Sequence, residues 1–314
     1  GISKTNIDFF NTKIIGIKKL LWGINEIEIY SENLKSEKIL NFKKKNEDLF
    51  SIIKNFDLYN HLFLNLNKNK LFNFKRKIDY QKLMKSDYKL IFNCDHNNLI
   101  SKKFFHNKIN KNYNSFAYAT SFQHEKLLNN HTASQIFTKR GPLAFLPVSS
   151  TETSVVYSAR GKKDIDLENL INKYNSRYKI FKMRKVFIYE LKSSNLRSYY
   201  HKNIIAFGDL LHRLHPLAGQ GFNMTIRDIK QLNKLIEFKK EHGLDLDNSI
   251  CSDFEKKTKN SNYLFSNGID FIYEFFNLES KFKNDNLSKS IKLLGKNKIV
   301  NNFFTKFADN GFLI

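Results

Sequence analysis

The chain has 314 residues, of which 41% are hydrophobic and 14% aromatic, so it can bury a large core and is too apolar to be disordered. Its net charge of +23 comes from 45 Lys and only 8 Arg. Because Arg is preferred for contacts with phosphates and bases, this composition argues against nucleic-acid binding and leaves attraction to an anionic membrane surface open. The cysteines, Cys94 and Cys251, have no metal-binding spacing, which fits a reducing cytoplasm.

The first hundred residues alternate between helical and strand patterns. Apolar residues at helical spacing predict a helix over 3–22, with Ser3 as a candidate N-cap, and a second helix over 47–66. Alternation around Ile27 and Ile29 predicts a strand. The apolar run over 88–93 predicts another strand, which ends in the polar turn 94–98.

The central section has the period-two alternation of a half-buried sheet. Strands are predicted over 116–122, 133–137, 143–148, 154–159 and 186–191, with a helix inserted over 163–176. Several short strands separated by turn signals indicate an antiparallel sheet. No apolar run approaches the ~18 residues that a transmembrane helix needs.

A strand, a glycine-rich loop and a helix follow in the order that places backbone N–H groups at an electron-rich ligand. The apolar residues 204–207 lead into Gly-Asp-Leu-Leu-His-Arg-Leu-His-Pro-Leu-Ala-Gly-Gln-Gly-Phe-Asn over 208–223, and the helix continues to about 236. Gly219 and Gly221 allow close approach of a flat ligand, and Asn223 is a candidate cap for the helix. Asp209 is placed to accept hydrogen bonds from sugar or polyol hydroxyls. Beyond Cys251 the chain is predicted to be helical.

This run closely resembles the second flavin-binding motif of the class A flavoprotein monooxygenases, which have the para-hydroxybenzoate hydroxylase fold. The His-Pro-x-Ala-Gly-Gln-Gly-x-Asn form over 215–223 is most similar to the ubiquinone-biosynthesis hydroxylases. Weaker similarity over 123–137 and 141–147 covers their sheet domain. The resemblance implies that Asp209 binds the ribityl chain of FAD and that Pro216 lies beside the reacting face of the flavin. It also implies that backbone groups contact the flavin pyrimidine edge at Gly219, Gln220, Gly221, Phe222 and Asn223.

Two features depart from the family pattern. No Gly-x-Gly-x-x-Gly occurs, so the first βαβ unit, which holds the FAD pyrophosphate in the family, is expected to be absent or lost. The family's Asp-Gly motif, which contacts FAD and the nicotinamide donor, reads Asp95-His96 here, with Lys102 or Lys103 as the basic residue that follows. Asp95 is therefore assigned to the cofactor site, while the use of NAD(P)H is in question.

The resulting hypothesis is a mixed α/β FAD-dependent hydroxylase fold, in which an interrupted Rossmann-like cofactor domain is combined with an antiparallel sheet substrate domain and C-terminal helices. The expected boundaries are a partial FAD-binding domain with substrate-side helix and strand at 1–105, the sheet domain at 106–192, the FAD-binding strand-loop-helix at 193–240 and the helical region at 241–314. No metal is expected, and no acid or base catalyst can be named.

The expected activity is an FAD-dependent, O2- and NAD(P)H-using monooxygenase that hydroxylates the ring of a polyprenylated phenol or quinol in ubiquinone biosynthesis. The alternative is a non-catalytic relative that acts as an assembly or lipid-binding subunit. The expected location is cytoplasmic, with peripheral contact at the inner face of the membrane through the basic surface and the C-terminal aromatic helices. A quinone-biosynthesis complex fits the resemblance, and nucleic acid is not an expected partner.

Overall fold

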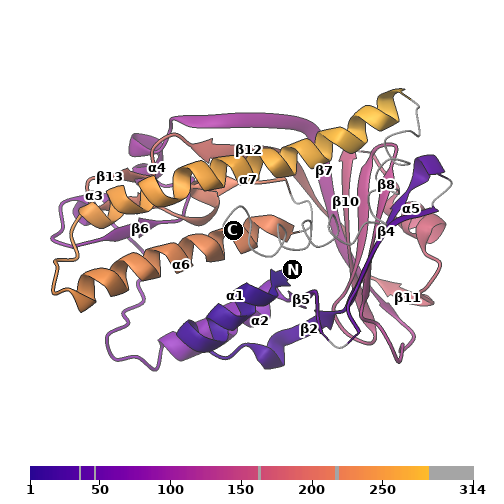
Figure 1. The fold of residues 1–314 in the computed structure, drawn as a ribbon, viewed down its shortest axis with the longest axis horizontal. Helices are drawn as coiled ribbons and strands as arrows, with labels where there is room; N and C mark the ends of the chain where they lie inside the picture. The colour runs from indigo at the N-terminus through magenta and orange to yellow at the C-terminus, as the bar shows by residue number, and fades with distance from the viewer. Residues whose placement is uncertain (35–36, 46, 162–163, 216–218, 283–314) are drawn as a thin grey trace.

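A large mixed sheet forms one side of the molecule and a group of helices and small sheets forms the other (Figure 1). The computed structural model describes residues 1–34, 37–45, 47–161, 164–215 and 219–282. Within these residues the large sheet has nine strands. In spatial order they are β15 (His212–Arg213), β12 (Phe187–Leu196), β7 (Lys108–His124), β10 (Glu152–Arg160), β9 (Gly141–Pro147), β8 (Thr132–Thr138), β3 (Glu26–Ser31) and β4 (Glu37–Lys43), while β11 (Ile180–Met183) pairs with the end of β7.

Side chains from these strands pack into cores on both faces of the large sheet. Tyr118 and Phe122 of β7 pack on one face against α5 (Leu167–Tyr174), where Ile171 is buried. Phe137 of β8 packs on the other face against Met224. The predicted strands are confirmed, and the pairing is antiparallel except between β3 and β8. The helix predicted over 163–176 is present but shorter, at Leu167–Tyr174, and residue 163 lies outside the described residues.

A second, smaller sheet contains the two strands that lead to the predicted site. Its order is β13 (Tyr200–His201), β14 (Ile204–Ala206) and β6 (Ile91–Asn93), with β14 and β6 parallel. Every residue of β14 is buried, as expected for a strand covered on both faces. Its core includes Leu232 and Phe254 and is flanked by α3 (Tyr80–Met84) and α4 (Leu99–Phe104).

Two long helices, α6 (Gln220–Glu241) and α7 (Ser249–Phe282), run beside each other toward the large sheet (Figure 1). Below them in this view lie α1 (Lys4–Phe9), continued by a π-helical turn at Phe10–Ile14, and α2 (Asn55–Leu66). A third sheet has the order β1 (Ile2–Ser3), β5 (Phe50–Ile53) and β2 (Leu21–Ile24). Among the described residues, no helix combines the length and the apolar character needed to cross a bilayer.

Both N-terminal helices are shorter than predicted. The first ends at Ile14, and Leu21–Ile24 is a strand. The second begins only at Asn55, because Phe50–Ile53 pairs with β2 and β1. A four-residue apolar run fits a helix or a strand equally well by periodicity, so its pairing partners decide. The predicted C-terminal helix is confirmed as far as Phe282, and the prediction for 283–314 lies outside the described residues.

Candidate functional site

The glycine loop folds so that open space lies above the start of α6. Gly208 and Gly219 have φ values of 61° and 65°, in the left-handed region that favours glycine. A Cβ added at Gly208 or Gly221 would meet no atom within 4 Å, whereas one at Gly219 would lie 3.3 Å from the Gly1 nitrogen. The first N–H groups of a helix have no partner within it and carry its positive dipole end. The start of α6 can therefore bind a carbonyl or an anion.

Asn223 binds the N-terminal segment and does not cap α6. Its Oδ1 accepts hydrogen bonds from the Ser3 N–H and the Asn6 side chain, both at 2.9 Å, and its Nδ2 donates to the Gly1 carbonyl at 3.2 Å. The predicted capping role is wrong because the N-cap is Gly219, so that Asn223 lies a full turn inside the helix. Ser3 and Asn6 were not predicted as part of the site, since their partner lies more than 200 residues away.

Two buried side-chain oxygen atoms, one at the start of α6 and one in the N-terminal segment, lack a hydrogen bond. Gln220 is only 7% exposed and its Oε1 has no partner. Asn6 is fully buried and its Oδ1 also has no partner. Buried polar atoms in folded proteins are nearly always paired, so such atoms at a loop with open space indicate a missing donor. Phe222 is partly exposed beside them, and Pro216 lies outside the described residues. The start of α6 therefore fits a ligand with hydrogen-bond donors.

Asp95 and Asp209 lie at the carboxyl ends of the parallel neighbours β6 and β14. The strand ends are joined by the hydrogen bond from the Phe207 N–H to the Asn93 carbonyl, at 2.9 Å. Burial and the charge of Asp209 raise the pKa of the Cys94 thiol, which places the Asp209 carboxylate near the start of the Asp95 turn. Ligands of parallel sheets bind at this edge. Asp95 is exposed, and its Oδ1 accepts the Asn97 N–H at 2.8 Å.

A buried amide network holds the turn that carries Asp95. Nδ2 of Asn98 donates to Oδ1 of Asn93 at 2.6 Å, and Nδ2 of Asn93 donates to the Ser101 hydroxyl at 2.8 Å. Ser101 in turn donates to the Asp95 carbonyl. The Asn98 side chain also caps α4, a role that its position before 99–104 would have predicted.

His212 belongs to a buried triad that joins three elements. Its Nε2 lies 2.5 Å from Oδ2 of Asp228 on α6, and Nδ2 of Asn262 on α7 donates to Oδ1 of the same carboxylate at 2.9 Å. The His212 and Asp228 side chains are 0% and 2% exposed. The triad fixes the loop and both long helices relative to one another.

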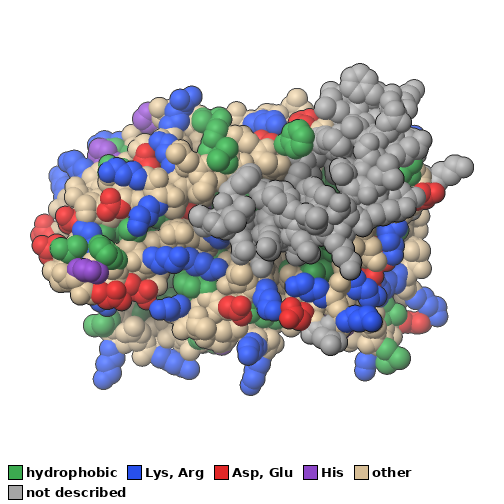
Figure 2. Space-filling view, in the orientation of Figure 1, with side chains coloured by type: hydrophobic (Ala, Val, Ile, Leu, Met, Phe, Trp, Pro, Cys, Tyr) green, Lys and Arg blue, Asp and Glu red, His purple; other side chains and the backbone are tan. Residues whose placement is uncertain are grey.

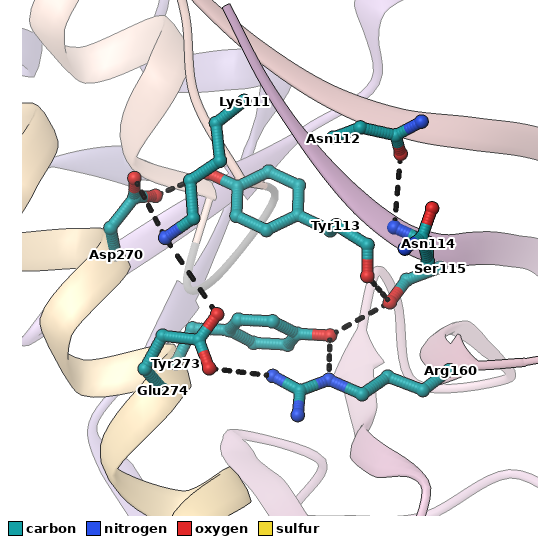
Figure 3. Close-up of polar contacts among 9 residues, drawn as sticks. All are labelled: Lys111, Asn112, Tyr113, Asn114, Ser115, Arg160, Asp270, Tyr273 and Glu274. Carbon is teal, nitrogen blue, oxygen red and sulfur yellow. Dashed lines mark hydrogen bonds and ion pairs between the residues drawn. The ribbon is translucent and has the colours of Figure 1, made fainter.

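His215 ends the described part of the loop and lies against a polar cluster between α7 and the large sheet. Its ring centroid is 5.1 Å from that of Tyr113 and 4.0 Å from that of Tyr273, and neither ring nitrogen has a partner. Figure 3 shows how the two tyrosines are held. Tyr113 donates to Asp270, and the Arg160 guanidinium donates from Nε to the Tyr273 hydroxyl at 2.9 Å.

The charged side chains of this cluster form ion pairs between α7 and the large sheet. Lys111 on β7 lies 3.4 Å from Asp270 and 3.7 Å from Glu274, both on α7, and Arg160 on β10 lies 3.2 Å from Glu274 (Figure 3). The cluster joins α7 to the sheet directly behind His215.

His215 is expected to make folding sensitive to acid. Burial, and then the positive charges of Arg160 and Lys111, lower its pKa from 6.5 to about 3. The neutral ring is therefore favoured by folding, so its contribution is complete above pH 6.5 and is lost as the pH falls toward 3. Since one pH unit corresponds to about 1.4 kcal/mol, we expect a loss of about 3 kcal/mol between pH 6.5 and pH 4.

Urea unfolding of the wild type and of His215→Phe at both pH values measures this loss. The variant should lack this part of the pH dependence, whereas His96→Phe, which changes an exposed histidine, should retain it. Equal pH dependence in the wild type and His215→Phe would contradict the prediction.

No protein-family profile matches the chain. Among curated proteins it is similar to the mitochondrial ubiquinone biosynthesis monooxygenase COQ6 of Homo sapiens, with 26% identity over 202 residues covering 50% of this chain and 43% of that protein. COQ6 of Schizosaccharomyces pombe is 22% identical over 274 residues, covering 71% and 57%. The 3-demethoxyubiquinol 3-hydroxylase of Escherichia coli is 24% identical over 152 residues, covering 45% and 39%.

Solved structures show the same fold at lower identity. The p-nitrophenol 4-monooxygenase PnpA of Pseudomonas putida superposes with a TM-score of 0.75 and 12% identity, covering 99% of this chain and 87% of that one. HpxO of Klebsiella pneumoniae, complexed with FAD and uric acid, has a TM-score of 0.73 and 9% identity, covering 98% and 87%.

The fold is therefore that of the FAD-dependent monooxygenases, as predicted. Within that class the predicted resemblance to the ubiquinone-biosynthesis hydroxylases is confirmed. The chain spans about half the length of the curated relatives it matches.

Proposed function

We propose that the protein is an FAD-dependent monooxygenase that hydroxylates the aromatic ring of a polyprenylated phenol or quinol in ubiquinone biosynthesis. The observation that carries this proposal is the start of α6, where a Cβ at Gly221 would enter open space and the buried Gln220 oxygen has no hydrogen-bond partner. The first N–H groups of a helix have no partner within it, so they are available to a ligand there. The similarity to COQ6 and to the 3-demethoxyubiquinol 3-hydroxylase, both named for ubiquinone chemistry, supports the substrate class.

Each residue of the proposed site has a separate task. When bound, FAD supplies the activation of O2. Amides at the start of α6 would stabilise negative charge on the carbonyl edge of the flavin ring, and Asp209 would accept hydrogen bonds from polyol hydroxyls of the cofactor. Pro216 is assigned to the reacting face and Asp95 to contact with FAD and the nicotinamide donor. The backbone contacts at the start of α6 come from Gly219, Gln220, Gly221, Phe222 and Asn223.

NAD(P)H is proposed as the electron donor. The presence of Asp95, which matches the aspartate of the family's Asp-Gly motif, supports this donor. The glycine of the motif is replaced by His96, so a change of His96 tests whether the donor can reach the site. A His96→Gly variant that oxidises NAD(P)H faster than the wild type would show that the ring of His96 restricts access of the donor.

We propose a domain division in which segments are grouped by whether they contact FAD or the substrate. Residues 1–105 and 193–240 are assigned to the FAD side, 106–192 to the substrate sheet and 241–314 to the C-terminal region, of which the structure describes α7 as far as Phe282. Residues 26–43 also add β3 and β4 to the large sheet, so the first segment contributes to both sides. The proposed partners are the polyprenylated substrate, O2, a membrane surface and a quinone-biosynthesis complex, in a cytoplasmic location and without nucleic acid.

Flavin content of the purified full-length protein tests the proposal. We expect a yellow protein with flavin absorption, released as FAD on denaturation, and NAD(P)H oxidation that depends on an added prenylated phenol. A colourless protein that does not take up added FAD would overturn the proposed activity and favour a non-catalytic assembly or lipid-binding subunit.

A further inference from the structure

A cationic and apolar surface lies on α2 and the segment after it, outside the proposed cofactor site. We call residues 55–78 the docking surface. Leu71 is 93% exposed and Phe74 is 53% exposed, although both are large apolar side chains. The other exposed apolar side chains of this surface are Phe56, Tyr59, Leu64, Leu66 and Ile78. Exposed apolar residues that are grouped in one segment mark an interaction site more often than residues scattered singly over a surface.

The charges of the docking surface all have one sign over twenty residues. Between Asp57 and Asp79 the chain has no acidic residue. The five cations of the same stretch are exposed, and they are Lys68, Lys70, Lys75, Arg76 and Lys77. In Figure 2, Lys and Arg side chains project from the lower edge of the molecule, on the side where Figure 1 places α2. The surface therefore fits an anionic partner that also accepts apolar groups.

Aromatic packing gives the docking surface a defined shape. Phe63 of α2 stacks on Tyr59 at 5.8 Å and makes edge contacts with Phe72 at 6.5 Å and Phe74 at 5.3 Å. These contacts hold the segment after α2 against the helix. On its opposite face α2 is anchored by Leu58, which is buried in a core with Phe10 and Ile226. The helix therefore faces the core with one side and presents apolar side chains on the other, while the cations lie on the segment after it.

We propose that the docking surface binds the headgroup region of an anionic lipid bilayer. Cations are drawn to the negative surface, while leucine and aromatic side chains enter the boundary between headgroups and acyl chains. An acidic protein would match the charge, but it would need complementary pockets for the protruding apolar side chains, which a fluid lipid interface accepts without them. The inference deepens the membrane contact of the proposed function and moves it from the C-terminal helices to α2 and the segment after it.

Flotation of the full-length protein with vesicles tests whether the cations of the docking surface contribute to membrane binding. The probes are vesicles of phosphatidylcholine alone and of phosphatidylcholine with 30% phosphatidylglycerol. We expect binding to the anionic vesicles only. Because each Lys near a surface is worth about fivefold in binding, Lys68→Gln, Lys75→Gln and Lys77→Gln together should weaken it on the order of 100-fold. Lys126→Gln, Lys256→Gln and Lys257→Gln, which remove the same charge elsewhere, should weaken it far less.

A second pair of variants tests the exposed apolar side chains of the docking surface. Leu71→Ser with Phe74→Ser should lose most of the vesicle binding that remains at high salt, whereas Leu128→Ser with Leu244→Ser, which removes other exposed leucines, should not. The proposal is overturned if the triple Lys→Gln variant of the docking surface and the triple Lys→Gln control variant weaken vesicle binding equally. It is also overturned if the docking-surface variants change the oligomeric state and leave vesicle binding intact.

Flavin content, measured on the same preparations without lipid, separates the two proposals. Loss of vesicle binding with normal flavin content supports the docking surface. A flavin-free protein that still binds anionic vesicles through these residues would contradict the proposed activity and leave the docking surface standing.

Discussion

Replacing Asp228 by alanine is expected to lower the free energy of unfolding by about 3–5 kcal/mol, the range found when one partner of a buried pair is removed. The carboxylate holds His212 at 2.5 Å and the Asn262 amide at 2.9 Å, and both it and His212 are almost fully buried. Its loss leaves two buried polar groups without their partner and opens a cavity between α6 and α7. Urea unfolding followed by circular dichroism measures the change.

The control is Asp253→Ala on α7. Asp253 is only half-buried, so its removal should change the free energy of unfolding by less than about 0.5 kcal/mol. Asn262→Ala, which removes one of the two bonds to Asp228, should fall between them, at about 1–3 kcal/mol. If Asp228→Ala is no less stable than Asp253→Ala, the triad does not hold the loop.

Replacing Gly221 by valine is expected to remove most bound flavin while leaving the fold intact. A Cβ at this position meets no protein atom within 4 Å, and Gly221 has no left-handed φ, so we expect a stability change of less than about 1 kcal/mol. The same side chain would fill the space assigned to the ligand. Inserting methyl groups into a filled site costs about 1–3 kcal/mol, which corresponds to flavin binding about 10–100-fold weaker.

Gly16→Val provides the matched control, because Gly16 is exposed and also meets no atom within 4 Å. Flavin per protein should be normal in this variant and strongly reduced in Gly221→Val, with both proteins showing wild-type circular dichroism. Normal flavin binding by Gly221→Val would show that no ligand occupies the start of α6.

Local patterns decided much of the fold. The alternation in 116–122 and 154–159 follows from the two-residue repeat of a strand, and glycines at 208 and 219 are favoured because the backbone there adopts a left-handed conformation. The loop motif over 208–223 was sufficient to predict the fold class, because its strand, turn and helix are neighbours in the chain. These features depend on interactions within a few residues, which one sequence records.

Only the tertiary structure decided the partners of these residues. Asn223 was expected to act on its own helix, yet it binds Ser3 and Asn6 from the other end of the chain. The strand Phe50–Ile53 was read as a helix because the pairing with β2 is not local. His212, Asp228 and Asn262 come from three elements and form one buried triad. Burial and long-range pairing supply the free energy that chooses among conformations which local propensity leaves nearly equal, so their outcome appears only when the chain is folded.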